Sequence, residues 1–387
     1  MRVTTLDNRD HGMNVLAYVH LRNIYRSTGA GRVARNLVEG LSATRHINVR
    51  VLADRGDHAQ LPSDIGAPWD AMPYVFFEKE TSLQQARWLL TRRPHAQRYW
   101  PDADIMFCTA ESFVPKGRAR LAVTAHDAAY FEPDVHARAM TTWTQRWKWK
   151  VLYRILASQA DMIHTVSAFS ADRLGHYFPA LRSRIRVVHN AVTSTFFEPP
   201  PPETRDFLMR HRLLDRPYVH VPGGLSVRKN ADLILEVWPL VAREVPDAVL
   251  AISGHVGEPY RAAAARLGDS VRLLGFTTDD ELKRVYHEAQ LTWFPSRYEG
   301  FGLPILESMA CGAPVISTNV SAIPEIAGGK ARLLPLDSVD AHRDAVIDLL
   351  RDARQRALMR REGLAHAAGF TWPRAAQRLS HLFEQLL

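Results

Sequence analysis

The chain has 387 residues, a length that predicts two or three domains of ordinary size. Hydrophobic residues form 46% of it and charged residues 23%, so large buried cores are expected and wholesale disorder is excluded. The 49 Lys and Arg residues outnumber the 41 Asp and Glu residues, and this modest excess of +8 suits an anionic ligand or a membrane surface at least as well as nucleic acid.

The sequence contains no pattern of a membrane-spanning helix, a signal peptide or a zinc site. Its longest interval without charged residues, Ser308 to Pro324, is interrupted by prolines and a glycine, and the N-terminus lacks the apolar core of a signal peptide. Only Cys108 and Cys311 are present, and neither a Cys-x-x-Cys nor a His-Glu-x-x-His spacing occurs. We therefore expect a soluble cytoplasmic protein in a reducing compartment.

The first half of the chain alternates short apolar runs with helical patterns. Residues 1–12 are polar and aperiodic and are expected to form a loose tail. A buried strand over 13–19 leads through the glycine turn at 29–31 into a helix with apolar residues every four positions from Val33, and a strand over 47–52 follows. Further strands are predicted at 105–108, 121–125, 162–166 and 185–188. This alternation is typical of a parallel sheet covered by helices on both faces.

Four consecutive prolines, Pro199 to Pro202, indicate a linker, because proline continues neither a helix nor a central strand. Beyond it the alternation restarts, with strands predicted at 218–221, 249–253, 271–274, 291–294 and 315–316. We expect a Rossmann-like N-terminal domain over 1–198, a Pro-rich linker over 199–204, a second Rossmann-like domain over 205–368 and a C-terminal helix over 369–387. Ligands of such sheets bind outside the carboxyl ends of the strands, so the chemistry is expected in the cleft between the domains.

The strongest chemical signal is the segment 296–307, which follows a predicted strand and opens a helix. Gly300 and Gly302 allow the backbone to approach a ligand closely. The amides of Phe301, Gly302 and Leu303 then lie at the positive end of a helix, a place that binds phosphates or sugar hydroxyls.

Two glutamates flank these glycines. Glu307 falls in the predicted first turn of the helix, where a carboxylate is favoured and can accept from the vicinal hydroxyls of a ribose. Glu299 precedes the glycines and could meet hydroxyls of the group beyond the phosphates. A lone glutamate at a helix start is more often a solvated residue or a cap, but the pair together with Gly-Phe-Gly-Leu-Pro favours a ligand site.

The spacing from Glu299 to Glu307 resembles the Glu-x7-Glu pattern of retaining GT-B glycosyltransferases, and residues 309–317 resemble its continuation in glycosyltransferase family 4. The resemblance covers nearly the whole chain and is weakest over 54–103. It implies the α/β GT-B fold, in which two Rossmann-like doubly wound domains face each other across a cleft. It also implies that the first domain binds the acceptor, that the second binds the nucleotide sugar, and that the helix over 369–387 packs back on the first domain.

Other motifs resemble further parts of the family pattern. Gly29-Ala30-Gly31-Arg32 is similar to the acceptor-side glycine loop, and His126-Asp127 is similar to a pair that ends a strand beside the donor sugar. Residues 223–230 resemble the phosphate-binding turn, and Arg228 and Lys229 supply cations where a helix N-terminus already favours anions. Some relatives carry a basic residue where Gly224 stands, so part of the usual grip on the diphosphate is missing here.

The resemblance implies a retaining, metal-independent hexosyltransferase of the kind that builds bacterial polysaccharides or glycolipids, with mannose from GDP-mannose as the first choice of donor. The expected catalytic residues are His126, Arg228, Lys229 and Glu299. The expected donor-binding residues are Gly31, Asp127, Gly223, Arg228, Lys229, Glu299, Gly300, Phe301, Gly302, Leu303 and Glu307. No cofactor and no divalent metal is expected. Asp102-Ala103-Asp104 matches the metal signature of another glycosyltransferase fold, but it precedes a first-domain strand and is interpreted as loop polarity.

A basic, tryptophan-bearing helix is expected between Trp143 and Arg154. Trp143 and Trp147 are four residues apart and share a helical face, whereas Lys148 and Lys150 lie off it. Such a helix can rest on anionic lipid at the inner face of a membrane, or it can be a core helix with a solvated cationic side. Nucleic-acid binding is a weaker hypothesis, since no recognised module for it is present.

Two other functions remain open at this stage. A catalytically degenerate GT-B pair could sense a nucleotide or act as a scaffold in a polysaccharide assembly complex, although the intact Glu299, Glu307, Lys229 and His126 argue against it. An epimerase or a phosphorylase of similar architecture is the enzymatic alternative. Phosphorolysis needs a pyridoxal lysine or a phosphate site that the motifs do not provide.

Overall fold

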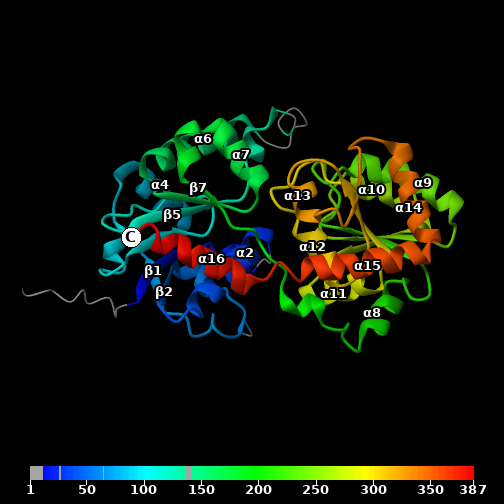
Figure 1. Ribbon diagram of the computed structural model, residues 1–387, viewed down its shortest axis with the longest axis horizontal. Coiled ribbons are helices and arrows are strands. Elements are labelled where there is room, and N and C mark those ends of the chain that lie inside the picture. Colours follow the sequence, from blue (N-terminus) through cyan, green and yellow to red (C-terminus); the bar gives the residue numbers. More distant parts are fainter. Residues whose placement is uncertain (1–11, 26–27, 64, 134, 136–141) are drawn as a thin grey trace, which may run out of the picture.

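The computed structural model describes residues 12–25, 28–63, 65–133, 135 and 142–387. It contains two parallel sheets, each covered by helices, in two bodies that lie side by side (Figure 1). The predicted fold class, two doubly wound Rossmann-like domains, is therefore confirmed. Most of the tail predicted at residues 1–12, up to residue 11, lies outside the described residues.

The first sheet has seven strands in the order β3-β2-β1-β4-β5-β6-β7. They are β1 (Met13–Tyr18), β2 (Ile47–Asp54), β3 (Tyr74–Phe77), β4 (Ile105–Cys108), β5 (Arg120–Ala125), β6 (Met162–Thr165) and β7 (Ile185–Val187). The helices of this body are α1 (Leu21–Tyr25), α2 (Gly29–Ser42), α3 (Arg55–His58), α4 (Thr81–Thr91), α6 (Trp143–Gln159) and α7 (Ala168–Tyr177).

The second sheet has six strands in the order β10-β9-β8-β11-β12-β13. They are β8 (Tyr218–Pro222), β9 (Val249–Ser253), β10 (Val271–Gly275), β11 (Leu291–Phe294), β12 (Val315–Thr318) and β13 (Arg332–Leu334). The helices of this body are α8 (Thr204–Arg210), α9 (Ala231–Glu244), α10 (Tyr260–Ala265), α11 (Asp279–Glu288), α12 (Leu303–Ala310), α13 (Ile323–Ala327), α14 (Val339–Arg351) and α15 (Ala353–Ala367), and the chain ends with α16 (Trp372–Glu384).

Both faces of the first sheet are buried, as its continuous apolar strands require. Along β1, Val15 and Ala17 belong to one hydrophobic cluster, whereas Leu16 and Tyr18 belong to another on the opposite face. Successive strand residues point to opposite faces, so an uninterrupted apolar run buries both sides of the sheet. The alternation of strands and helices leaves the loops at the carboxyl edges free to carry polar residues.

The last helix, α16, belongs in space to the first body although it follows the second in the chain (Figure 1). Its Trp372, Leu379 and Phe383 share a hydrophobic cluster with Val33 and Leu37 of α2. The helix is amphipathic, and its opposite side carries charged residues. The second body is thereby tied to the first through two crossings, one before α8 and one before α16.

We predict that Phe383→Ala lowers the free energy of unfolding by about 3–5 kcal/mol, because it removes a fully buried ring that packs at 5.3 Å from Phe107. Urea denaturation checks this value. Exposed Gln385→Ala, one position past the end of the same helix, is the matched control and should change the unfolding free energy by less than about 0.5 kcal/mol. Equal effects of the two variants would contradict the packing described for α16.

Candidate functional site

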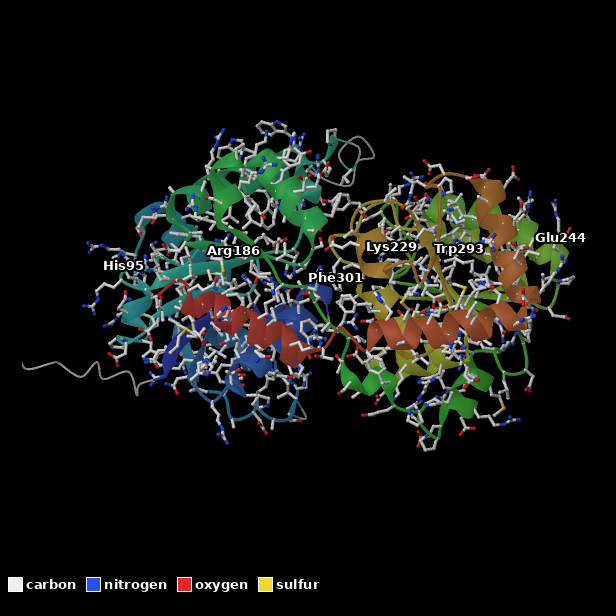
Figure 2. The ribbon with its side chains drawn as sticks, viewed as in Figure 1. His95, Arg186, Lys229, Glu244, Trp293 and Phe301 are labelled. Carbon is white, nitrogen blue, oxygen red and sulfur yellow. The ribbon has the colours of Figure 1, made fainter. Side chains whose placement is uncertain are left out.

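The loops that carry the sequence motifs lie at the carboxyl edges of both sheets and meet between the two bodies. The hydroxyl of Ser167, which precedes α7, donates to the carbonyl oxygen of Gly300 at 2.6 Å. A Cβ on Gly300 would overlap the carbonyl oxygen of His126, so only glycine allows the two loops to approach this closely. Phe301 also lies between the bodies, whereas Lys229 lies within the second (Figure 2).

Two cations converge on one carboxylate in the second body. Nη1 of Arg228 and Nζ of Lys229 each lie 2.8 Å from Oε1 of Glu299. Burial alone would raise the pKa of Glu299, but the two cations outweigh it and lower the pKa to about 2. Glu299 is therefore ionised at any physiological pH. It holds both cations where the loop after β8 meets the loop after β11.

Lys229 is the most deeply buried member of this group. Its ammonium lies 4.1 Å from the centroid of the Phe294 ring, and desolvation lowers its pKa to about 8 although Glu299 opposes the shift. An anion that takes the place of Glu299 would meet a cation already stripped of water. Because charge pairs strengthen in a dry site, this is a favourable position for a phosphate group.

The backbone conformation and close packing of the turn from β8 to α9 explain why position 224 carries glycine instead of a basic residue. Gly224 has φ of +76°, and a Cβ there would overlap the carbonyl oxygen of His255. A basic side chain cannot occupy this turn without moving the neighbouring loop. Gly223 precedes it, and its α-carbon faces the stem of Lys229, which fills the space beside the turn.

Glu307 lies on α12 and is 3% exposed. Its Oε1 accepts from Nη1 of Arg32 at 2.7 Å, and its Oε2 lies 3.4 Å from the hydroxyl of Tyr286. The helix begins at Leu303 after Gly302, whose φ is +101°, so Glu307 falls in the second turn rather than in the predicted first turn. Its partner Arg32 comes from the first body, and the contact therefore crosses the cleft.

His126 and Asp127 follow β5 and face this group of charges from the first body. The backbone N–H of His126 donates to Glu111 at 2.6 Å, and its Nε2 is buried with no protein partner among the described residues. Asp127 accepts from the amide of Ala129 at 2.8 Å, and burial raises its pKa above the usual range. The hydrogen-bonding capacity of this Nε2 is therefore not used by any described protein group.

Gly31 lies in the first turn of α2, directly before Arg32. A Cβ at this position would overlap the carbonyl oxygen of Asn23, so the glycine is explained by the packing of α2 against α1. Its assignment to the donor site stays a prediction. The neighbouring Arg32 makes the contact with the second body.

Several residues of the site carried no recognisable signal in the sequence. Glu111 contacts His126, which is 15 positions away in the chain, and Tyr286 contacts Glu307, which is 21 positions away. Phe276 is 83% exposed at the carboxyl end of β10 and lies over His255, with ring centroids 6.2 Å apart and an angle of 28°. An exposed aromatic beside the turn predicted to bind phosphate offers a surface on which a nucleobase can stack.

Asp102 and Asp104 lie at the opposite edge of the first sheet. Oδ2 of Asp104 accepts from the amide of Asn14 at 2.9 Å, and the carbonyl of Asp102 accepts from the Asn14 side chain at 2.9 Å. Both residues fix the start of β1, which agrees with their interpretation as loop polarity. Within the described residues, no group of three or more His, Cys, Asp or Glu side chains is placed to hold a metal ion.

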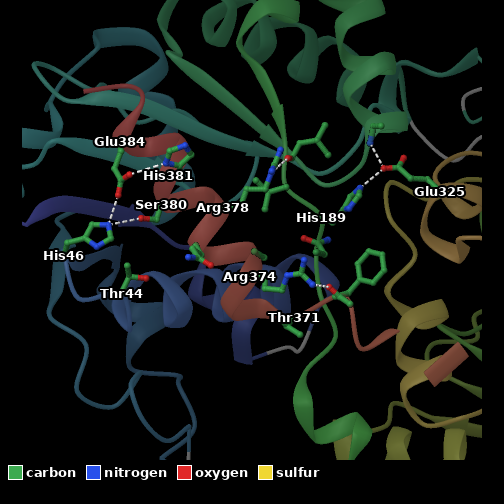
Figure 3. A pocket seen from close by; sticks show the side chains of 18 residues that line it. Thr44, His46, His189, Glu325, Thr371, Arg374, Arg378, Ser380, His381 and Glu384 are labelled. Carbon is green, nitrogen blue, oxygen red and sulfur yellow. Dashed lines mark hydrogen bonds and ion pairs between the residues drawn. The ribbon is translucent and has the colours of Figure 1, made fainter. Parts of the chain in front are cut away.

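A pocket of about 1000 Å³ lies outside this site, along α16 (Figure 3). On one side, Glu325 of α13 accepts from the amides of Ala168 and Phe169 at 2.8 and 3.1 Å and pairs with His189 at 2.7 Å. These contacts join the second body to the first near the crossing points of the chain. None of the predicted catalytic or donor-binding residues is among those that line the pocket.

Comparison with known proteins agrees with this arrangement. Residues 27–196 match the family model "Glycosyltransferase Family 4", and residues 216–352 match "Glycosyl transferases group 1". The O-antigen chain mannosyltransferase B of Escherichia coli is 28% identical over 375 residues, which cover 94% of this chain and 97% of that protein. The structure of Anabaena HepE in complex with UDP and glucose has a TM-score of 0.73 at 16% identity and covers 96% of this chain and 99% of its own.

A second relative matches a shorter part of the chain. The GDP-mannose-dependent alpha-(1-6)-phosphatidylinositol monomannoside mannosyltransferase of Mycobacterium tuberculosis is 31% identical over 248 residues. The match covers 60% of this chain and 62% of that protein.

We predict that the affinity for a nucleoside diphosphate falls as the pH rises through about 8, because Lys229 then loses the charge that attracts the phosphates. Calorimetric titration between pH 6.5 and 9.5 measures this. Lys229→Arg is the matched variant, since its guanidinium stays protonated, and this fall should be absent from it. Identical pH profiles for the two proteins would show that Lys229 does not contact the phosphates.

Proposed function

The chain belongs to glycosyltransferase family 4, a family of retaining hexosyltransferases, and on this basis we propose that it transfers mannose from GDP-mannose to a hydroxyl of a carbohydrate or lipid-linked carbohydrate. The observation that carries the proposal is the convergence of Arg228 and Lys229 on Glu299. Two cations and a carboxylate lie together at the carboxyl edge of the second sheet, where a diphosphate and a hydroxyl-rich sugar would be adjacent.

Each of the four parts of a nucleotide sugar has a chemically suitable group among the residues of this site. Phe276 and His255 offer a stacking surface for the base, and Glu307 offers acceptors for the ribose. Arg228 and Lys229 suit the diphosphate, and Glu299 is then released to accept from hydroxyls of the sugar. Binding of the donor is thus an exchange of one anion for another at the same two cations.

The same cations support catalysis. As the bond between the anomeric carbon and the phosphate oxygen breaks, negative charge grows on the departing diphosphate, and Arg228 and Lys229 stabilise it. The acceptor hydroxyl attacks from the face that the diphosphate leaves, and its proton passes to the leaving phosphate oxygen, so the anomeric configuration is retained. His126, whose buried Nε2 has no protein partner among the described residues, would face the sugar from the first body.

The choice of mannose and guanosine is supported by the names of two relatives, both mannosyltransferases and one of them GDP-mannose-dependent. A polysaccharide acceptor is supported by the O-antigen relative, which aligns along almost its whole length. Phosphatidylinositol mannoside, named for the mycobacterial relative, is an acceptor of the lipid-linked class. A catalytically inactive nucleotide-binding protein remains the alternative function.

We predict that the protein releases GDP from GDP-mannose when a mannose-containing acceptor is present, and that Lys229→Ala lowers turnover by at least about tenfold, or roughly 1.4 kcal/mol. The Michaelis constant for the donor should change less, because the cation acts most strongly on charge that develops in the transition state. Lys330→Ala, which removes a half-exposed lysine outside the site, is the control. Nucleotide binding with no turnover of any nucleotide sugar would instead support the binding-protein alternative.

The helix α6 supports a further proposal, that the protein docks on an anionic membrane surface. Trp143 is 72% exposed and Trp147 is 59% exposed, although one side of the same helix packs Leu152 and Leu156 into the core. The cations Lys148, Lys150 and Arg154 are exposed on it as well. Exposed tryptophans beside lysines match the boundary between lipid headgroups and acyl chains. Among the described residues, no helix combines the length and apolarity needed to cross a bilayer.

We predict that the protein sediments with vesicles containing phosphatidylglycerol and that salt releases it, because each exposed cation contributes about 1 kcal/mol of screened attraction. Replacing Lys148, Lys150 and Arg154 by Gln should weaken the binding. Replacing the exposed Arg266, Arg354 and Arg361 of the second body by Gln is the control for net charge. Vesicle binding that does not change with salt concentration, and that falls equally in both triple variants, would contradict docking through α6.

A further inference from the structure

The carboxylate of Glu307 depends on a cation that the other domain supplies. Nη1 of Arg32 lies 2.7 Å from Oε1 of Glu307, and the two residues are 275 positions apart in the chain. The side chain of Glu307 is 4% exposed, whereas that of Arg32 is 23% exposed toward the cleft. A buried carboxylate without a cation tends to take up a proton, so this single contact bears on whether Glu307 is charged.

The other groups that face Glu307 do not replace Arg32. Burial raises the pKa of Glu307, and Asp279 at the start of α11 raises it further, whereas Arg32 opposes both effects. Lys229 lowers it less, and its ammonium is already bound to Glu299. Tyr286 and Cys311 are neutral neighbours, since burial raises the pKa of each well above its usual range.

The first turn of α2 is built so that Arg32 points across the cleft. Thr28 caps the helix by accepting from the amide of Gly31 at 3.0 Å, and the carbonyl of Thr28 accepts from the amide of Arg32 at 2.9 Å. Gly31 allows this turn to lie directly against Asn23. The carbonyl of Arg32 in turn accepts from the side chain of Asn36 at 2.8 Å. These contacts fix the backbone of the first turn of α2, and the Arg32 side chain extends from it to the second domain.

We propose that Arg32 is a positioning residue of the ribose site: although it belongs to the acceptor domain, it neutralises buried Glu307 and so keeps this carboxylate ionised and able to accept hydrogen bonds from the ribose hydroxyls. The inference rests on the proposed function, in which Glu307 contacts the ribose. It adds that the nucleotide site is complete only when the two domains are in contact. Nε of Arg32 is buried and has no protein partner in the described part of the chain, so the guanidinium can shift as the ribose enters.

The test compares GDP with 2′,3′-dideoxy-GDP by calorimetry between pH 5.5 and 7.5. Both nucleotides carry the same base and the same titrating phosphates, so the ratio of their affinities isolates the ribose contact. In the natural protein the ratio should be on the order of tenfold or more and should change little with pH. In Arg32→Gln it should fall toward one at low pH and recover as the pH rises. Arg32→Lys, which keeps a cation, should restore the pH-independent ratio.

Two variants complete the design. Glu307→Gln should give a ratio near one at every pH, and Arg32→Met, which retains the aliphatic stem, replaces Arg32→Gln if that variant does not fold. A ratio that stays high and independent of pH when the cation is removed would overturn the role of Arg32 and leave the ribose contact intact. Equal affinity of the natural protein for both nucleotides would instead remove the ribose contact of Glu307, and the inference with it.

Discussion

The site depends on the pairing of buried carboxylates with cations in a place from which water is largely excluded. Glu299 holds Arg228 and Lys229, and Glu307 holds Arg32. Leaving the buried Glu299, Lys229 or Glu307 charged and unpaired would cost several kcal/mol, so each pair fixes the loops that carry it. The pairs of Glu299 can be exchanged for ligand contacts, because a diphosphate offers Arg228 and Lys229 another anion, whereas Arg32 stays beside Glu307 when the ribose hydroxyls bind. Stability of the empty site and recognition of the donor therefore rest on the same atoms.

This pairing is possible because each sheet directs its carboxyl edge toward the gap between the bodies. The strand order reverses beside β1 in one sheet and beside β8 in the other, and crevices form at such points. The close contact of Gly300 with the loop of His126 brings the two edges together. A hydrogen bond between His189 and Glu325 lies near the chain crossings, so the bodies are joined on two sides of the interface.

Strong apolar periodicity made most strands and the division into two parallel sheets predictable from the sequence. The edge strands β3 and β13 were not predicted, because each is short and only partly buried and so lacks a continuous apolar signal. Glu299 and Lys229 could be predicted to share a site because both follow strands that are neighbours in a doubly wound sheet. The contact of Arg32 with Glu307 could not, because it depends on how two domains face each other. The reason for Gly224 likewise required the position of His255.

The central claim is that the diphosphate of a nucleotide sugar takes over the two cations that Glu299 holds in the empty protein. A crystal structure of the complex with GDP-mannose, or with an unreactive analogue of it, tests this most directly. We predict phosphate oxygens within hydrogen-bond distance of Nζ of Lys229 and of the Arg228 guanidinium, with Glu299 turned toward the sugar. A nucleotide bound elsewhere, for example in the pocket along α16, with both cations still paired to Glu299, would contradict the account.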